Sequence, residues 1–474
     1  MEYNSLIMTD YEFSTDDTIC AISTAPGTGG IAVIRVSGPN AFTIVERIWR
    51  GRRLSDMESH TCAVGTVVDA DNNVIDRPVA TVFRGPKSFT GQDTVELSVH
   101  GSVWIQRQLI EVLTQAGARL AGRGEFTRRA YSSGKLDLAE AEAVADLINA
   151  SSKAAHRMAI SQMRGHLSQA LGNIRGQLID LASLLELELD FSEEDLEFAS
   201  RIHLRELSVS LHETVSSLAE SFATGNALKN GIPVALAGLT NVGKSTILNL
   251  LLNEEKAIIS DIHGTTRDTI EDTLTINGTL FRIIDTAGLR ETADTVERIG
   301  IARAKDKISK AAIVIWITDA TSGRESIIES WETLLPHLTA DTPVIAVINK
   351  IDLKEPDEDS IDLIRELCPH SAIIQHTSQN PATLAALREA IMEAADMPEI
   401  SESDIIVTNH RHYQALTQAD ENILRVIDGL DNTLPPDLIA QDLRQAIHHL
   451  GEITGEITPS DILTTIFSRF CIGK

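Results

Sequence analysis

The segment 238–245 reads GLTNVGKS and has the spacing of a phosphate-binding loop, with an apolar run before it and a helical pattern after it. Its glycines let successive backbone N–H groups turn toward a phosphate, and the start of the following helix adds its positive end. We expect Lys244 to reach the outer phosphates and Ser245 to bind Mg²⁺. The predicted nucleotide contacts in this segment are Asn241, Val242, Gly243, Lys244, Ser245 and Thr246.

Two segments further along the chain carry groups that suit a triphosphate and its metal. Asp285 begins the sequence DTAG at the end of a strand-like run, where it is expected to act on Mg²⁺ through water while the Gly288 N–H senses the γ-phosphate. Thr266 offers a hydroxyl as the second protein ligand of Mg²⁺. The predicted nucleotide contacts of the two segments are Ser260, Asp261, Ile262, His263, Gly264, Thr265, Thr266, Asp285, Thr286, Ala287 and Gly288.

A third motif, Asn349-Lys350-Ile351-Asp352, follows the apolar run PVIAVI and has the residue types that read a guanine base. The Asp352 carboxylate can accept from both the N1–H and the exocyclic amine of guanine, a pair that adenine does not offer. A site built to satisfy a polar group rejects the analogue that leaves it unpaired, so GTP is expected to be preferred to ATP. A further guanine-contacting segment is expected at 377–379, although Gln379 replaces the small residue usual after Ser378.

The residues that drive hydrolysis are not decided by spacing alone. Ras-type GTPases orient the attacking water with a glutamine after the aspartate-glycine motif, but this chain has Leu289 there. The acids available in the same loop are Glu291, Asp294 and Glu297. The positive charge needed in the transition state could come from Arg267, from Arg290, or from a monovalent cation bound with the help of Asn241, which could equally be a simple turn-former.

These motifs lie in a chain of 474 residues that is long enough for two to four domains. Its composition, 43% hydrophobic and 23% charged, is that of a globular protein, and no apolar run is long enough to cross a membrane. The first twenty residues are acidic and resemble neither a signal nor a transit peptide, so a cytoplasmic protein without a membrane partner is expected. Four scattered cysteines argue against a disulfide framework or a zinc site.

The net charge of −27 opposes nucleic-acid binding at first sight, but residues 1–133 are nearly neutral. Two arginine clusters in that region are the candidates for contact with nucleic acid, although ordinary solvated charge remains the alternative. The first cluster contains Arg47, Arg50, Arg52 and Arg53, and the second contains Arg119, Arg123, Arg128 and Arg129.

Hydrophobic periodicity sets the expected organisation of the chain. Residues 18–133 alternate turns with strand-like segments, among them 31–38 and 93–101. Apolar residues from 141 to 148 lie on one helical face, and those from 160 to 185 predict one long helix or two in series. Short β-branched strands alternate with helices over 231–396, which is typical of a parallel doubly wound sheet. We therefore predict an extension at 1–17, an α/β domain at 18–133, a helical domain in two parts at 134–230 and 397–474, and an inserted G domain at 231–396.

The nucleotide motifs, the tail FCIGK and the segments GEFTRRAYSSGKLDLAEAEA and DTAGLRETADTVERIGI together resemble the MnmE (TrmE) family of bacterial tRNA modification GTPases. The resemblance covers the chain from about residue 18 onward. It implies a multidomain fold of mixed α/β and all-α type, with an N-terminal α/β folate-binding and dimerisation domain, a helical domain and a Ras-like P-loop G domain. It also implies a homodimeric GTPase that depends on K⁺ and is activated when its G domains pair.

The resemblance assigns roles to individual residues. Glu297 becomes the acid that orients the attacking water, and Cys471 becomes a candidate nucleophile, with simple packing of the tail as the alternative. The implied K⁺ ligands are Asn241, Ser260, Ile262 and Thr265, and the implied Mg²⁺ ligands are Ser245 and Thr266. The implied folate contacts are Arg35, Glu96, Lys135 and Lys474.

The implied activity is the installation of an aminomethyl or carboxymethylaminomethyl group at C5 of the tRNA wobble uridine. It would use a carbon from 5,10-methylene- or 5-formyl-tetrahydrofolate and an FAD-dependent MnmG-like partner, in a heterotetramer. Two alternatives from other classes remain open on the sequence alone. One is a ribosome-assembly GTPase of the Era or Der type, and the other is a folate-dependent aminomethyl transferase whose GTPase is only regulatory.

Overall fold

The computed structural model describes residues 16–190, 201–256, 272–285, 308–339, 342–396, 401, 404–457, 460–468 and 470–473. The chain divides into two compact units. The first comprises Met1–Ala145, Gln162–Ser208 and Glu421–Lys474, and the second comprises Asp146–Ser161 and Val209–Asp420. Within the described residues, no helix has both the length and the apolar character needed to span a membrane.

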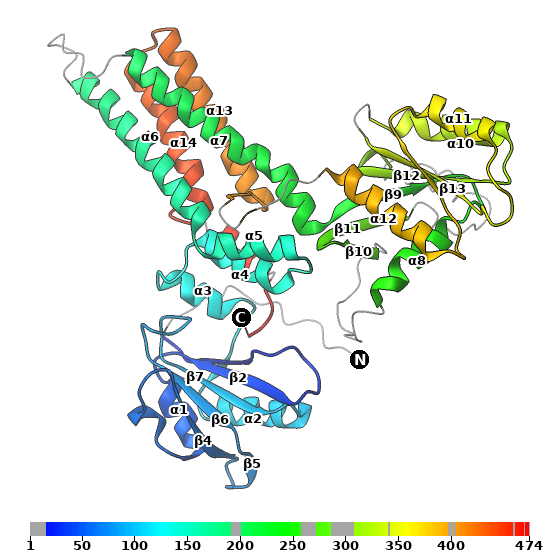
Figure 1. The fold of residues 1–474 in the computed structure, drawn as a ribbon. Helices are drawn as coiled ribbons and strands as arrows, with labels where there is room; N and C mark the ends of the chain where they lie inside the picture. The colour runs from blue at the N-terminus through cyan, green and yellow to red at the C-terminus, as the bar shows by residue number, and fades with distance from the viewer. Residues whose placement is uncertain are drawn as a thin grey trace, which may run out of the picture. The chain divides into compact units, whose positions relative to one another are not determined.

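The first unit contains an eight-stranded sheet with the order β3-β4-β6-β7-β2-β1-β8, in which β5 pairs with β4 (Figure 1). Its pairs are antiparallel apart from β1 with β8. The strands are β1 (Ile19–Ile22), β2 (Ile31–Ser37), β3 (Trp49–Gly51), β4 (Thr61–Val68), β5 (Val74–Asp76), β6 (Val79–Phe83), β7 (Thr94–His100) and β8 (Arg119–Leu120). Alternating burial along β2 follows its alternating apolar residues, which is the pattern of a sheet with one covered face.

The covered face of this sheet packs against two amphipathic helices, α1 (Ala41–Ile48) and α2 (Val103–Gln115). Their buried residues, which include Ile44, Val45 and Leu109, join the strand residues Ile34 and Leu97 in one core. A short helical turn, η1 (Leu54–Asp56), and the helix α3 (Glu125–Ser132) complete this part of the unit. The two strands predicted at 31–38 and 93–101 are confirmed as β2 and β7.

A buried ionic cluster fixes the start of α3. Glu125 and Arg129 are 2% and 4% exposed, and their side chains are 3.0 Å apart. Arg119 lies 2.6 Å from Glu125 and 2.5 Å from Asp17, which also pairs with Arg129. Burial alone would raise the pKa of Glu125, but Arg119, the Gly122 N–H and Arg129 outweigh it and hold that pKa below its usual range. The charges of Arg119 and Arg129 are therefore balanced by Asp17 and Glu125; Arg129 is buried, while Arg119 keeps 39% of its side chain exposed.

Long helices account for most of the remaining first unit and for part of the second. They are α4 (Leu138–Asn149), α5 (Lys153–Met163), α6 (His166–Asp190), α7 (Arg201–Asn230), α13 (His410–Asp431), α14 (Pro436–Thr454) and α15 (Ser460–Ser468). The predicted helical pattern at 160–185 is two helices in series, because Gly165 at φ +79° ends α5 before α6 begins. Gly172 and Gly176 are accommodated inside α6.

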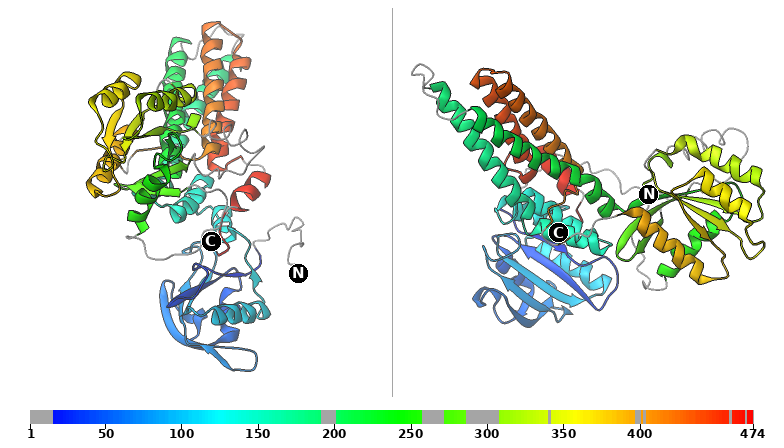
Figure 2. Two further views of the ribbon diagram at one scale, coloured as in Figure 1. Left: turned by 90° about the vertical axis from the view of Figure 1, so that its right-hand side faces the viewer. Right: turned by 45° about the horizontal axis from the view of Figure 1, so that its top comes forward.

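The second unit is built on a six-stranded sheet with the order β10-β11-β9-β12-β13-β14. Figure 2 shows this sheet and its helices in green to orange. Every pair is parallel except the β10–β11 hairpin. The strands are β9 (Ile232–Ala237), β10 (Asp272–Ile276), β11 (Thr279–Asp285), β12 (Ile313–Asp319), β13 (Val344–Asn349) and β14 (Ala372–Gln375). From β9, the strands β11 and β10 lie on one side and β12, β13 and β14 on the other. The carboxyl end of β9 therefore lies at a topological switch point, where such sheets usually bind ligands.

Helices cover both faces of this sheet, and the core residues show which helix lies on which face. Leu251 of α8 (Lys244–Lys256) and Leu387 of α12 (Pro381–Ala395) pack on one face, in the same core as Ile283. Trp331 of α10 (Arg324–Leu334) and Ile364 of α11 (Glu358–Leu367) pack on the other. A helical turn, η3 (Leu335–His337), follows α10. The predicted multidomain combination of an α/β sheet domain, helices and a doubly wound nucleotide-binding domain is confirmed.

Local sequence explains where two of these helices begin. The Asp357 side chain accepts the backbone N–H of Ser360 at the start of α11, and the Asn380 side chain accepts that of Ala382 at the start of α12, which has Pro381 in its first turn. Each cap satisfies a backbone donor that has no partner inside the helix. The cap at Asn380 also fixes the end of the loop that follows β14.

Candidate nucleotide and folate sites

The loop between β9 and α8 has the backbone that a phosphate cradle requires. Gly238 has φ +144°, and a Cβ added to it would lie 2.2 Å from the Ile317 carbonyl oxygen of β12. Gly243 has φ +100°, and a Cβ there would lie 2.2 Å from the Asn349 side-chain nitrogen. Both positions therefore exclude a side chain for steric as well as conformational reasons. The spacing of the two glycines in the sequence is explained by two close approaches of the loop to neighbouring strands.

Lys244 is held by its own loop. Its ammonium donates to the carbonyl oxygens of Gly238 at 2.9 Å and Leu239 at 2.7 Å. Ser245 and Thr246 are exposed in the first turn of α8. The Lys244 ammonium is thus held against the first residues of the loop, and the exposed Ser245 could bind a cation through its hydroxyl oxygen.

The guanine-reading motif is fastened directly to the phosphate loop. The Asn349 amide, on a residue 6% exposed, donates to the Val242 carbonyl oxygen at 2.8 Å. Lys350 adopts the left-handed φ of +61°, and its ammonium donates to the Asn241 carbonyl oxygen at 2.7 Å. Asn241 itself is exposed and has φ +64°. The two predicted motifs are therefore brought together by hydrogen bonds between β13 and the β9–α8 loop.

Asp319, at the end of β12, supports this connection and was not predicted. Its carboxylate lies 2.5 Å from the Lys350 ammonium and also accepts the Thr321 hydroxyl and N–H, each at 2.8 Å. Burial alone would raise the pKa of Asp319, but Lys350 and Thr321 outweigh it and hold that pKa below its usual range. The signal was available in the sequence, because Asp319 ends an apolar run in the same way as Asp285 does.

The loop after β14 surrounds the base-reading carboxylate. Asp352 is exposed, and its Oδ1 accepts the Thr377 hydroxyl at 2.8 Å while its Oδ2 accepts the Gln379 amide at 3.1 Å. His376, the residue before this loop, is 1% exposed and its Nδ1 lies 3.0 Å from the Thr383 hydroxyl. Burial lowers the pKa of His376, so this ring stays neutral near pH 7. The segment predicted at 377–379 thus contacts Asp352, the residue predicted to read guanine.

Several predicted residues fall outside the part of the chain that the structure describes. Asp285 ends β11, beside Leu236 of β9, but its side chain is not among the described atoms. The residues wholly outside the described ranges are Ser260, Asp261, Ile262, His263, Gly264, Thr265, Thr266, Arg267, Thr286, Ala287, Gly288, Arg290, Glu291, Asp294, Glu297 and Lys474.

Two of the expected folate contacts face each other in the sheet of the first unit. Arg35 of β2 lies directly opposite Glu96 of β7, and their side chains form an ion pair of 2.8 Å with 20% and 25% of each side chain exposed. The Arg35 guanidinium lies 5.4 Å from the ring centres of both Phe89 and Phe126. An arginine, a carboxylate and an exposed aromatic ring together suit a planar ligand with hydrogen-bonding edges.

Lys135 approaches the same region through the loop that contains Phe89. A Cβ added to Gly91 would lie 3.7 Å from the Lys135 side chain, and the Ser133 hydroxyl donates to the Thr90 carbonyl oxygen at 2.9 Å. The segment 133–135 therefore lies against the loop 89–92. Three of the four expected folate residues belong to adjoining segments of one domain.

The tail at 470–473 docks on this domain. The Ser23 hydroxyl donates to the Gly473 carbonyl oxygen at 3.1 Å, and a Cβ added to Gly473, at φ +97°, would lie 2.1 Å from the Ile22 carbonyl oxygen. Ile472 forms a bridge with Arg123. Cys471 is exposed between these contacts. Ile22, which the tail contacts, pairs with Ile34 of β2, the residue before Arg35.

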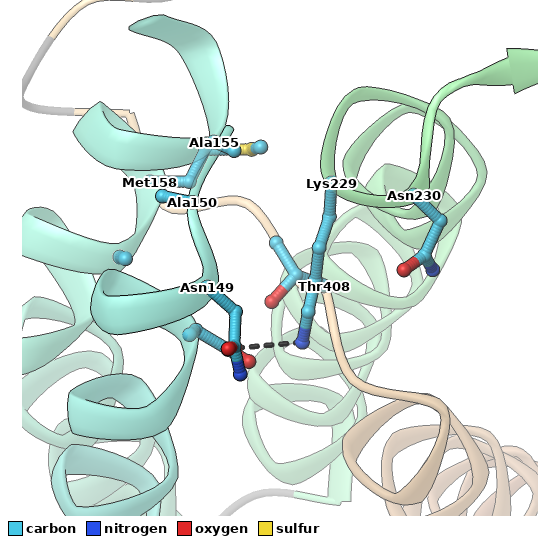
Figure 3. A pocket seen from close by; sticks show the side chains of 9 residues that line it. Asn149, Ala150, Ala155, Met158, Lys229, Asn230 and Thr408 are labelled. Carbon is cyan, nitrogen blue, oxygen red and sulfur yellow. Dashed lines mark hydrogen bonds and ion pairs between the residues drawn. The ribbon is translucent and has the colours of Figure 1, made fainter. Parts of the chain in front are cut away.

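A cavity of about 210 Å³ lies in the second unit, where α7 leads into β9 (Figure 3). Lys229 and Asn230 of α7 face Asn149 and Thr408 across it, and the Lys229 ammonium pairs with Asp146 at 2.6 Å. The cavity contains none of the predicted site residues. It marks the attachment of the sheet to the helices rather than the nucleotide site.

The fold and the site together define a P-loop GTPase. A mainly parallel sheet presents the phosphate loop after β9, an aspartate at the end of β11 and an Asn-Lys-x-Asp motif after β13 at the same edge. The reaction of this class is hydrolysis of GTP.

Comparison with known proteins gives the family. Residues 18–135 match the family described as "GTP-binding protein TrmE N-terminus", and residues 138–471 match "MnmE helical domain". A protein named tRNA modification GTPase MnmE from Parabacteroides distasonis is 50% identical over 96% of this chain and 100% of its own length. Proteins of the same name from Bacteroides thetaiotaomicron and Christiangramia forsetii are 46% and 47% identical, each over 97% of this chain and 99% of its own length. The chain belongs to the MnmE (TrmE) family, and the resemblance noted from its motifs is confirmed.

Proposed function

We propose that this chain is a K⁺-dependent GTPase that modifies tRNA together with an FAD-dependent, MnmG-like partner. The product is an aminomethyl or carboxymethylaminomethyl group at C5 of the wobble uridine, with its carbon supplied by a tetrahydrofolate derivative. The tRNA substrate is the one named for its relatives, which align with nearly the whole chain. A cytoplasmic location follows from such a substrate. Membership of this family excludes the Era or Der alternative.

The guanine nucleotide site is the observation on which the proposal rests most directly. Lys244, now bound to carbonyl oxygens of its own loop, exchanges them for the outer phosphates when a triphosphate enters. Asn349 and Lys350 hold the phosphate loop in register with the base-reading carboxylate of Asp352. Ser245 and Thr266 would hold Mg²⁺, which neutralises charge on the β- and γ-phosphates.

Potassium is the proposed source of positive charge next to the phosphates. Asn241 suits this task because it lies in the phosphate loop with an exposed side chain and a turned backbone. The other proposed ligands are Ser260, Ile262 and Thr265, with Glu297 orienting the attacking water. In a homodimer the G domains would meet across a twofold axis with the cation near the contact.

The test of this part is GTP turnover in KCl and in NaCl at equal ionic strength. Turnover should be much faster in KCl, and equal rates in the two salts would exclude the cation. Glu297→Ala should lose hydrolysis but bind GTP as well as the unmodified protein does. If Glu297→Ala also lost GTP binding, the residue would maintain the fold rather than the reaction.

The folate part of the proposal is supported by the grouping of Arg35, Glu96 and Lys135 in adjoining segments. Glu96 would accept N–H groups of the pterin ring, and Lys474 is the fourth proposed contact. Cys471 is exposed beside this site, where a thiolate could attack a reactive carbon.

Calorimetry with 5-formyl-tetrahydrofolate tests this site. Gly473→Ala should weaken binding strongly, because its Cβ would clash with Ile22 and displace the tail. Gly30→Ala is the matched control, since an added Cβ there meets nothing within 4 Å. Equal affinity of the two variants for 5-formyl-tetrahydrofolate would show that the tail is not part of the folate site.

The route from nucleotide to helices is proposed to pass through the β10–β11 hairpin. Gly278, at the tip of this hairpin, is so close to Lys153 of α5 that an added Cβ would lie 3.4 Å from the lysine Cβ. β10 begins at residue 272 and β11 ends at residue 285, so in the chain the hairpin lies between the segments 260–266 and 285–288 that are predicted to contact the nucleotide. A movement of either segment would therefore reach α5.

The proposed tRNA modification is tested by nucleoside analysis of tRNA from a deletion strain, with and without the wild-type gene. Unchanged wobble uridines in the deletion strain would refute it.

A further inference from the structure

Asp352 has both of its carboxylate oxygens occupied by side chains of one loop. Thr377 and Gln379 donate to Oδ1 and Oδ2 at 2.8 and 3.1 Å. An aspartate reads guanine by accepting the N1–H and the exocyclic amine, which also requires both oxygens. The protein's own side chains therefore already form the hydrogen bonds that Asp352 would otherwise offer to the base.

The two donors differ in how they are held. Thr377 is 8% exposed, and its hydroxyl also accepts the backbone N–H of Gln379 at 3.2 Å. Its position is fixed behind the carboxylate, and an oxygen with two lone pairs can accept from Thr377 and from a ligand together. Gln379 is exposed, and its side chain reaches Oδ2 from the solvent side. A base that enters from solvent meets the Gln379 amide and not the Thr377 hydroxyl.

The chemistry of the two groups makes them competitors. The Gln379 side chain ends in a planar N–H donor, as does the exocyclic amine of guanine, and its nitrogen rather than its oxygen must face a carboxylate. Asn380, the next residue, is fixed as the cap of α12. The backbone at Gln379 is thus anchored on both sides while its side chain can swing outward.

We infer that Gln379 is a built-in competitor of the guanine base, which covers the Asp352 carboxylate in the empty site and must leave before the nucleotide binds. This inference rests on the proposed guanine specificity of Asp352. Only molecules in which Gln379 has moved away from Asp352 can bind the base. The apparent dissociation constant of the nucleotide therefore equals the intrinsic constant divided by the fraction of molecules in that state. Gln379 thereby lowers the affinity of the site for any guanine nucleotide by slowing its association.

The variant Gln379→Ala removes the competitor and leaves Thr377 in place. Because the amide acts only in the empty site, the association rate constant for GDP should rise and the dissociation rate constant should stay the same. A single hydrogen bond of this kind in water corresponds to about a twofold to tenfold change in affinity. Gln375→Ala is the matched control, as this exposed glutamine at the end of β14 does not face Asp352.

Stopped-flow fluorescence with a labelled GDP, on the full chain, measures both rate constants. Faster association with unchanged dissociation in Gln379→Ala, and neither change in Gln375→Ala, supports the inference. Faster dissociation would show that Gln379 contacts the bound base instead, and unchanged constants would show that it does neither; both results overturn the inference. Labelled ADP is measured in parallel, because equal binding of ADP and GDP by the wild-type protein would refute the guanine specificity itself.

Discussion

The contact between Asp319 and Lys350 leads to a quantitative prediction for Asp319→Asn. The Asp319 and Lys350 side chains are 10% and 31% exposed, so their pair lies between a solvent-exposed and a buried ion pair. Lys350 also has a left-handed backbone, which a non-glycine residue keeps only when its surroundings hold it there. We expect the loss of the charge to free Lys350 from Asn241 and to weaken GDP binding by about 1–2 kcal/mol, or about fivefold to thirtyfold.

The assay is equilibrium titration with labelled GDP at several pH values. Since the pKa of Asp319 lies below its usual range, the pair stays intact between pH 5 and 8, and the ratio of the two affinities should be constant over that range. The control is Asp362→Asn, which breaks an exposed ion pair of α11. In this pair 67% of the Arg365 side chain and 72% of the Asp362 side chain are exposed. That variant should bind GDP like the wild type. Wild-type affinity in Asp319→Asn, or an equal loss in both variants, would refute the reasoning.

Two further substitutions test the loop geometry and the buried histidine. Gly243→Ala should abolish tight GDP binding, because its Cβ would displace the Asn349 amide. Gly172 lies inside α6 with open space around it, so Gly172→Ala should raise the free energy of unfolding by about 0.5–1 kcal/mol in denaturant titrations. His376 has a lowered pKa, so below about pH 6.5 the unfolded chain binds a proton that the folded chain does not, and stability falls as pH falls. His376→Asn, which keeps a partner for Thr383, should show a smaller loss of thermal stability between pH 7.5 and 5.5 than the wild type; an identical loss would mean that His376 does not titrate in this range.

The motifs were predictable because each is a short, contiguous pattern whose chemistry depends on backbone shape. The two glycines of the phosphate loop and the Asn-Lys-x-Asp sequence carry their signal within a few residues. Asp319 and His376 were missed because their roles arise only when neighbouring strands align, which places residue 319 beside residue 350. The spacing of charges could not show that the arginines at 119 and 129 form ion pairs with Asp17 and Glu125.

The segment at 377–379 illustrates an intermediate case. Its place after β14 was expected, but the sequence could not show which of its side chains would reach Asp352. The hydrogen bonds assign that contact to Thr377 and Gln379. A glutamine that looked like a departure from the usual pattern thus has a defined neighbour and a testable effect.

The contact between Ser23 and Gly473 joins residues that are 450 positions apart in the chain. During synthesis at roughly 5–20 residues per second, the segment that carries Ser23 waits on the order of tens of seconds for its counterpart to be made. The edge of β1 that later receives the tail stays open throughout that interval. Until residue 473 is made, the backbone groups of this edge have no tail to contact and are open to pairing with other chains.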